Sequence, residues 1–363
     1  MEQKDTTPII LTLDAGGTNF VFSAMQDGKE IAEPMRLPSE AADLGKCLAN
    51  LRNGFKTIMK QLDKKPAAIS FAFPGPADYA HGIIGDLPNF PSFRGGIALG
   101  PYLEEVFGMP VFINNDGNLF AYGEAMAGLL PEINNRLREQ GCKRQYKNIM
   151  GITFGTGFGC GVVIDGKLLT GDNGLGGDIW CFRNKKYPDY IAEESVSIRA
   201  VKRVYRELTG ETADLTPYDI FLIAEGQREG NAEAARQSFV ELGEMAGDAI
   251  AMALTIVDGL VVIGGGLAGA SKYIVPALVK ELNSQLGTFA GNRFPRMQVR
   301  SFNLEDNTEF EQFANDSSHM ILIPETDKSV AYDPESRVGV GVTKLGASQA
   351  IALGAYHYAV NNL

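Results

Sequence analysis

An internal repeat constrains the fold of this 363-residue chain more than any other sequence feature. Each copy has a Gly-Thr pair that precedes an Asp-Gly-Lys triplet by the same interval and follows an apolar run. The copies are Gly17-Thr18 with Asp27-Gly28-Lys29 after residues 9–13, and Gly155-Thr156 with Asp165-Gly166-Lys167 after residues 149–154. A strand, a glycine-rich turn, a second strand and a hairpin are thus repeated, which predicts two similar α/β lobes with a cleft between them.

Length and charge restrict the class of protein. The chain is long enough for two domains, because single hydrophobic cores usually stop growing at about 250–300 residues. Its 33 basic and 44 acidic side chains give a net charge of -11, which disfavours nucleic acid as a partner. The first eight residues are polar and resemble no signal segment, and no apolar run reaches the roughly 18 residues of a membrane span. We therefore expect a cytoplasmic protein without a membrane partner.

Strands and helices alternate along the chain. Apolar runs predict strands at 9–13, 20–25, 29–31, 67–73, 111–113, 149–154 and 260–263. Helical periodicity predicts helices at about 44–62, 119–130, 231–257 and 348–359. Residues 303–342 are polar and irregular, so a loop or a hairpin excursion is expected there. The domain prediction is a small lobe of residues 1–114 with a C-terminal helix at about 346–363, and a large lobe of residues 115–345.

The four cysteines show no paired C-x-x-C spacing and lie in or beside apolar stretches. We expect buried free thiols, with disulfides or a zinc site as the less favoured alternatives. The residues concerned are Cys47, Cys142, Cys160 and Cys181.

Three glycine-rich turns follow predicted strands. Glycines allow backbone N–H groups to approach phosphate oxygens, and a neighbouring carboxylate such as Asp14 could hold Mg²⁺ through water. The third turn suits close packing against an adenine or a ribose. Any one turn alone could be purely structural, but three together favour ATP binding. The candidate ATP-binding residues are Gly16, Gly17, Thr18, Asn19, Gly155, Thr156, Gly157, Gly264, Gly265 and Gly266.

Asp116 is the candidate catalytic base. It follows the strand predicted at 111–113, and ligands of open α/β sheets bind at the carboxyl ends of strands. A hydroxyl that attacks a γ-phosphoryl group must lose its proton, which requires a carboxylate within hydrogen-bonding distance. The alternative is that Asp116 caps the following helix. Amides and rigid turns at 74–76, 87–91 and 114–118 favour a carbohydrate as the acceptor.

These motifs, in this order, resemble the ROK family of sugar kinases and repressors over essentially the whole chain. The family's D-x-G-G-T, G-T-G-x-G, glycine-rich adenosine segment, N-D-A-N and G-E correspond to residues 14–18, 155–159, 264–266, 115–118 and 123–124.

The resemblance implies an actin-like ATPase (ribonuclease H-like) fold and a homodimer. MgATP would bind between the lobes, with a hexose or N-acetylhexosamine beside Asp116 as in a glucokinase. The sugar contacts that it implies are Gly75, Asn89, Asn115, Asp116, Asp178 and Glu193.

The sequence departs from the family pattern on the sugar side. Cys181 stands where the family has a zinc-ligating His, and the family's C-x-C-G-x-x-G-C cluster is missing from the segment that follows. We therefore expect no zinc site, with Trp180, Phe182 or Tyr187 packed where the metal would organise the chain.

Three alternatives to a kinase differ in what they require. A family repressor would need a DNA-binding module, and we expect none because only about eight residues precede the first strand. A catalytically inactive sugar sensor would not need the intact motifs around Asp116 and the three glycine turns. An assembling actin-like ATPase would have no use for Asn89 and Glu193 as sugar contacts.

Overall fold

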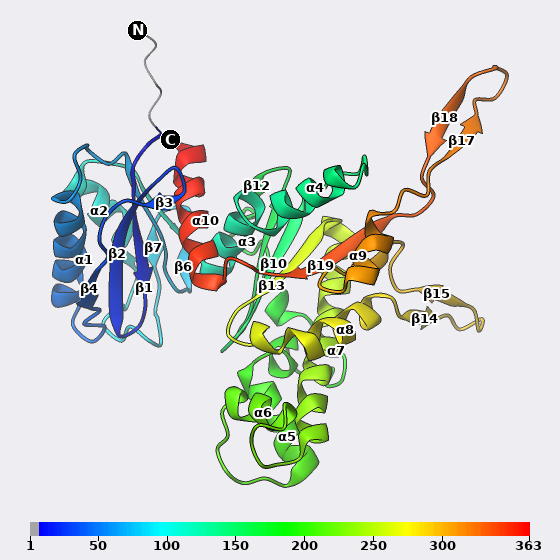
Figure 1. Ribbon diagram of the computed structural model, residues 1–363. Helices are drawn as coiled ribbons and strands as arrows, with labels where there is room; N and C mark the ends of the chain where they lie inside the picture. Colours follow the sequence, from blue (N-terminus) through cyan, green and yellow to red (C-terminus); the bar gives the residue numbers. More distant parts are fainter. Residues whose placement is uncertain (1–6) are drawn as a thin grey trace. The chain divides into compact units, whose positions relative to one another are not determined.

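The computed structural model describes residues 7–363 of the chain, which form two compact units (Figure 1). The first unit comprises Met1–Ala127, Leu168–Gly176 and Leu345–Leu363, and the second comprises Gly128–Lys167 and Gly177–Lys344. The prediction about the first eight residues falls largely outside the described part of the chain. Among the described residues, no helix combines the length and apolarity that a membrane crossing requires.

A mixed six-stranded sheet forms the centre of the first unit. Its order is β3 (Lys29–Glu30), β2 (Asn19–Gln26), β1 (Ile10–Ala15), β5 (Ala68–Ala72) and β9 (Val111–Asn114), with β4 (Met35–Pro38) also paired to β2. β1 runs antiparallel to β2, whereas β1, β5 and β9 are parallel. The other elements are α1 (Leu44–Met59), α2 (Leu99–Phe107), α3 (Asp116–Met126), α10 (Ala347–Asn362) and a small sheet of β6 (Ala77–Asp78), β7 (Ile83–Ile84) and β8 (Ile97–Ala98).

Side-chain alternation along β1 divides the core of this unit between the two faces of the sheet. Leu11 and Leu13 belong to a cluster with Phe55 of α1. Ile10 points to the other face, where it packs with Leu353 and Tyr356 of α10. The C-terminal helix therefore covers one face of the N-terminal sheet.

The second unit is built on another mixed six-stranded sheet. Its order is β12 (Lys167–Leu168), β11 (Phe158–Ile164), β10 (Ile149–Phe154), β13 (Leu260–Gly264), β19 (Arg337–Val342) and β16 (Arg300–Asn303). The helices are α4 (Leu129–Glu139), α5 (Ile198–Thr209), α6 (Pro217–Ala224), α7 (Ala232–Val257), α8 (Ser271–Leu282) and α9 (Asn307–Ala314). Two separate hairpins pair β14 (Gln285–Gly287) with β15 (Arg293–Pro295) and β17 (His319–Leu322) with β18 (Ser329–Tyr332).

The repeat predicted from the sequence is present in both sheets. In each unit the first strand pairs antiparallel with the next strand and parallel with a later one. The Asp-Gly hairpin turns also agree, with φ of 52° and 70° at Asp27 and Gly28, and 48° and 77° at Asp165 and Gly166. Positive φ at both central residues is what a tight two-residue hairpin turn requires.

Two expected elements differ from the structure. The helix expected at 119–130 is two helices, because α3 ends at Met126 and α4 begins at Leu129. The expected irregular segment 303–342 contains a hairpin, but it also contains α9 and the buried strand β19. The glycines of β19 interrupt its apolar pattern, so the strand was not recognised in the sequence. At Gly339 an added Cβ would lie 2.6 Å from the Leu304 side chain, which packs in the space that the glycine leaves.

The observed boundary between the units also lies later than expected. Residues 115–127 and 168–176 associate with the first unit, whereas the domain prediction placed them in the large lobe. The cause for residues 115–127 is the packing of α3 on α10. At Gly123 an added Cβ would lie 1.9 Å from the Ala350 oxygen, and at Gly354 it would lie 1.9 Å from the Leu119 oxygen. Glycines let the two helices touch along their backbones.

Candidate active site

The carboxyl ends of three parallel strands place the candidate site of the first unit. Asp14 of β1 pairs in register with Ala72 of β5, and Ala72 with Asn114 of β9. The Phe73 N–H continues this row by donating to the Asn114 carbonyl over 3.0 Å. The chain segments that leave the three strands therefore emerge at the same edge of the sheet, as the sequence predicted for Asp116.

The glycine-rich turn after β1 is held from both sides. The Gly16 N–H donates to the Asn19 carbonyl over 3.0 Å, which closes the turn. Ser39 fixes it from outside, because its hydroxyl donates to the Gly17 carbonyl over 2.6 Å and its N–H donates to the Thr18 carbonyl over 3.0 Å. The exposed Gly17 and Thr18 are thus presented on a rigid loop.

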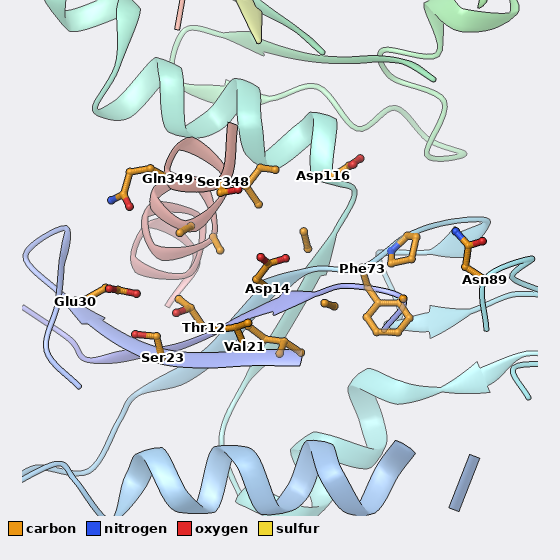
Figure 2. Close-up of a pocket in the computed structure, with 18 of the residues that line it drawn as sticks. Thr12, Asp14, Val21, Ser23, Glu30, Phe73, Asn89, Asp116, Ser348 and Gln349 are labelled. Carbon is orange, nitrogen blue, oxygen red and sulfur yellow. The ribbon is translucent and has the colours of Figure 1, made fainter. Parts of the chain in front are cut away.

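A pocket of about 440 Å³ opens above this edge, and its lining lies entirely within the first unit. Three polar residues of the sequence prediction line it, namely Asp14, Asn89 and Asp116, together with Gly17 (Figure 2). Asn89 lies close to the turn, because an added Cβ on Gly17 would be 3.9 Å from the Asn89 Cβ. Two carboxylates, an amide and a glycine-rich turn therefore meet at one cavity.

Asp116 is not the cap of α3. Asn115 is the N-cap residue, and its side-chain oxygen accepts from the Gly117 N–H over 2.8 Å. Asp116 is the first residue of the helix, and its carboxylate accepts from the same N–H over 2.8 Å. The side chain is exposed and lines the pocket, so it remains available to a ligand. Capping, the structural alternative for Asp116, is thus performed mainly by its neighbour.

The second unit has a corresponding turn between β10 and β11. Thr153 pairs with Gly159 and Phe154 with Phe158, and the Gly155 N–H donates to the Gly157 carbonyl over 3.1 Å. Here Glu193 supports the turn, since one carboxylate oxygen accepts from the Phe158 N–H over 3.0 Å. An added Cβ at Gly157 would lie 2.7 Å from that oxygen, so a larger residue there would displace the Glu193 carboxylate.

Arg199, which the sequence analysis did not identify, holds this arrangement together. Its guanidinium donates to the Thr156 carbonyl over 3.1 Å and to the other Glu193 oxygen over 3.1 Å. These bonds to Glu193, and a further one to Glu194, raise the pKa of Arg199. Glu193, predicted as a sugar contact, therefore has both carboxylate oxygens engaged in fixing the turn.

The third glycine segment follows β13 and packs on the β10–β11 turn. Gly265 has φ of 86°, and an added Cβ there would lie 2.4 Å from the Phe154 carbonyl oxygen. The Leu267 N–H donates to the same carbonyl over 3.0 Å. Gly266 is exposed, with open space where a Cβ would point. Within the second unit the two predicted nucleotide turns therefore lie side by side.

Three other predicted sugar contacts, Gly75, Asn115 and Asp178, lie outside the lining of the pocket. Gly75 is exposed next to Pro74, which does line it, and is joined to Pro76 by a cis peptide bond. Asp178 is half-buried in the second unit, where its charge adds to the effect of burial in raising the pKa of Cys160 to about 12.

The pocket also contains residues that the sequence analysis missed. Ser348 and Gln349 reach it from the start of α10, and Thr12 and Ser23 line it from the sheet. Ser23 is 5% exposed, and its hydroxyl has no hydrogen-bond partner among the described residues. Their spacing along the chain gives no signal, because a helix more than 320 residues from β1 completes the cavity.

Asn184 organises the segment that carries no zinc motif. It is 2% exposed, and its side-chain oxygen accepts from the N–H groups of Lys186 and Tyr187, each over 3.0 Å. Its side-chain nitrogen donates to the Ile191 carbonyl over 3.2 Å and to the Ser195 hydroxyl over 2.8 Å. One buried amide thus ties both ends of the loop.

Of the three aromatic residues expected to pack here, Phe182 is partly buried against the hydrophobic core of the second unit, whereas Trp180 is 40% exposed. The guanidinium carbon of Arg203 lies over the Tyr187 ring, 5.2 Å from the ring centroid. Within residues 7–363 there is no group of three or more His, Cys, Asp or Glu side chains that could hold a metal ion.

The thiol prediction is correct for three cysteines and wrong for one. All four are free; Cys47, Cys142 and Cys160 are buried, whereas Cys181 is exposed. Burial raises the pKa of Cys47, and that of Cys160, to about 12. Cys181 differs because it ends a short 3₁₀ turn, Ile179–Cys181, in the surface segment that departs from the family pattern.

The fold and these turns define an α/β protein with glycine-rich turns at the carboxyl ends of its strands. The ROK family profile matches residues 10–308, so the chain belongs to the ROK family.

A solved structure of a glucokinase from Parabacteroides distasonis is 60% identical to this chain, covers 100% of both chains and has a TM-score of 0.91. An N-acetylgalactosamine kinase from a Shewanella species is 25% identical over 308 residues, which are 80% of this chain and 91% of that protein. A glucokinase from Thermotoga maritima is 32% identical over 172 residues, and this match spans about half of each protein, 47% and 49% respectively.

Proposed function

We propose that the chain is an ATP-dependent sugar kinase that phosphorylates a hydroxyl of a hexose or an N-acetylhexosamine. The observation that carries the proposal is the meeting of Asp14, Asn89 and Asp116 at one pocket (Figure 2). Membership of the ROK family supports it. So does the 60% identity to a glucokinase over the full length of both chains, which makes glucose the first acceptor to test.

Asp116 is the proposed general base. Its carboxylate is exposed at the pocket and lies in the first turn of α3. The acceptor hydroxyl would give its proton to Asp116 as its oxygen forms a bond to the γ-phosphorus of ATP. The bond from that phosphorus to the bridging oxygen breaks at the same time, and ADP leaves. Asn89, Asn115 and Gly75 are proposed to bind the sugar's other hydroxyls.

Asp14 is proposed to hold Mg²⁺ through water. Its exposed carboxylate lies at the end of β1, beside the turn whose backbone N–H groups can donate to phosphate oxygens. When bound, Mg²⁺ offsets the negative charge of the phosphates. One carboxylate beside open space suits Mg²⁺, because this ion usually keeps several water ligands and takes few ligands from the protein.

The glycine segments of the second unit are proposed to bind the nucleotide as well. Gly155 and Gly266 face open space at their Cβ positions, which leaves their backbones accessible. Glu193 and Arg199 would act here by holding the 155–157 turn in one conformation. A direct sugar contact by Glu193 or Asp178 also remains part of the proposal. For the protein as a whole, we further propose two lobes with a cleft between them, a homodimer, a cytoplasmic location and no nucleic-acid partner.

The test is a coupled ADP-release assay with glucose, N-acetylglucosamine, N-acetylmannosamine, mannose, fructose and allose. We expect turnover with at least one of these sugars and a loss of about 10²–10⁴-fold in kcat for Asp116→Ala, the usual contribution of a general base. Asp63→Ala is the matched control, because Asp63 is an exposed carboxylate outside the pocket lining. Turnover with none of the sugars would refute the proposal that the chain is a sugar kinase.

Sugar binding without ADP release would instead support the inactive sensor. Isothermal titration of the same sugars distinguishes the two functions. Full activity of Asp116→Ala would leave the kinase intact but would show that the base is assigned to the wrong residue.

A further inference from the structure

The first unit contains another polar cavity that the proposed reaction does not use. It has a volume of about 470 Å³, and its described lining lies entirely within the first unit. We name the cavity lined by residues 77–81, 114, 118, 170–174 and 358 the second cavity. The pocket of Asp14, Asn89 and Asp116 is the reaction pocket. The described linings of the two cavities have no residue in common.

The start of α3 separates the second cavity from the reaction pocket. Asp116 and Asn118 are two residues apart on this helix, so their side chains point about 200° apart around its axis. Asp116 lines the reaction pocket, whereas Asn118 lines the second cavity. Asn114, the last residue of β9, also lines the second cavity. The second cavity is therefore a separate site on another side of the same helix.

Two buried amides of the second cavity have no hydrogen-bond partner in the described part of the chain. Asn114 is 3% exposed and Asn118 is 8% exposed, and neither side chain bonds to another described residue. Neither amide is among the unpartnered side-chain atoms that are sealed from solvent. Both are therefore reached through the cavity that they line. Buried amides are normally hydrogen-bonded, so these two favour a ligand that pairs with them.

The other walls of the second cavity are already ordered. The Tyr358 ring of α10 is held by edge contacts with the rings of Phe112 and Tyr122, at 5.9 and 5.7 Å between centroids. Its hydroxyl bonds to no other described residue. The turn at 170–174 is closed by the Gly176 N–H, which donates to the Thr170 carbonyl over 3.0 Å. A ligand would therefore enter a site that is largely formed.

Charge in the second cavity disfavours anions. Its carboxylates are Asp78 and Asp172, and its described lining contains no Lys or Arg. His81 is engaged by Asp78, since its Nδ1 lies 2.8 Å from the carboxylate, and this hydrogen bond lowers the pKa of Asp78. Phosphate esters would therefore be repelled. The described residues also include no group of three or more His, Cys, Asp or Glu side chains for a metal ion. A neutral ligand remains.

We propose that the second cavity binds an unphosphorylated sugar, at a site distinct from the reaction pocket. Sugar hydroxyls can donate to the Asp78 and Asp172 carboxylates, and they can both accept from and donate to the unpartnered amides. The volume lies within the range of about 300–1,000 Å³ that is usual for small-molecule sites. The inference goes beyond phosphorylation and does not depend on it, because it uses neither Asp14 nor Asp116.

Sugar titrations of the full chain without nucleotide test the proposal, with the side-chain amide signal of Asn118 followed by NMR. With at least one sugar of the ADP-release assay, we expect a saturable shift of this signal with a Kd on the order of 1 mM. Asp172→Ala should raise this Kd at least about tenfold, because an ionised acceptor is lost. Asp172 is exposed, so its replacement leaves the fold intact. Asp63→Ala, an exposed carboxylate of the same unit outside both linings, is the matched control.

Asn89→Ala separates the second cavity from the reaction pocket. Asn89 is exposed and lines only the reaction pocket, so the Asn118 shift should persist in this variant with the same Kd. In the same variant, glucose 6-phosphate should shift the signal at least about tenfold more weakly than glucose, because of the two carboxylates. Circular dichroism melting of each variant confirms that it is folded.

Four results would overturn the proposal. One is the absence of a saturable shift with every sugar up to about 50 mM. Another is a shift that disappears in Asn89→Ala, since it would then report on the reaction pocket. The third is an unchanged Kd in Asp172→Ala, and the fourth is equal binding of glucose 6-phosphate and glucose. A chain that shows this binding but releases no ADP would refute the kinase and leave the second cavity as proposed.

Discussion

Replacing Asn184 with alanine tests whether one buried amide holds the loop of residues 184–195 in the second unit. Alanine removes the acceptor for the N–H groups of Lys186 and Tyr187, and the donors to Ile191 and Ser195. Alanine fits the backbone conformation of Asn184, because Asn184 is not among the residues with positive φ. What is lost is the set of bonds that ties the start of the loop to its end.

The magnitude follows from these four hydrogen bonds. Each contributes about 1 kcal/mol net, and a buried group left without a partner costs about 1–3 kcal/mol. The N–H groups of Lys186 and Tyr187 can regain water, because these residues lie at or near the surface. We therefore expect a loss of about 2–4 kcal/mol, which for a domain of about 200 residues lowers the Tm by about 5–12 °C.

Calorimetry of the native chain, of Asn184→Ala and of Asn292→Ala measures this effect. Asn292 is an exposed asparagine of the same unit, so its replacement should shift the Tm by less than about 1–2 °C. Each sample is also scanned with EDTA, which we expect to leave the Tm unchanged. A Tm of Asn184→Ala equal to that of the native chain, or a native Tm that falls by several degrees with EDTA, would refute the reasoning.

Three further predictions concern packing, thiol chemistry and the second glycine turn. Gly354→Ala should lower the free energy of unfolding in urea by at least about 3 kcal/mol, because its Cβ would lie 1.9 Å from the Leu119 oxygen. Gly269→Ala is the control and should leave this free energy unchanged, because an added Cβ there faces open space. Iodoacetamide should label Cys181 alone in the folded protein and all four cysteines after denaturation, as mass spectrometry would show. Glu193→Gln should raise the KM for ATP about tenfold in steady-state kinetics, because a charge-assisted bond to the turn is lost. An unchanged KM would show that Glu193 does not support ATP binding through this turn.

The local structure of the site could be predicted from the sequence. The strands on either side of Asp14 are apolar runs with a glycine turn between them, and they form as predicted. The Asp-Gly hairpins adopt the expected positive φ values, since this dipeptide is suited to that backbone. Asp116 lies at the carboxyl end of a strand, because the apolar run before it ends at Ile113 and polar residues follow.

Partners that are distant in the chain could not be predicted in this way. The 155–157 turn depends on Arg199, and the loop of residues 184–195 depends on Asn184, yet neither residue belongs to a recognisable pattern. A single arginine on a helix and a single asparagine in a loop are usually exposed to solvent. Nothing in the sequence around Arg199 or Asn184 therefore indicates that either residue forms such contacts. Their roles arise only when the backbone brings carbonyl and carboxylate groups within reach.

By itself, the sequence determined the repeated strand–turn–strand units, the glycine segments and the position of Asp116, because these depend on contacts between near neighbours. Only the tertiary structure decided that α10 lines the pocket, that Asn115 rather than Asp116 caps α3, and that the β17–β18 hairpin exposes its apolar side chains. The physical reason is that burial and hydrogen bonding between distant segments depend on how whole elements pack. No local pattern of residues encodes that packing.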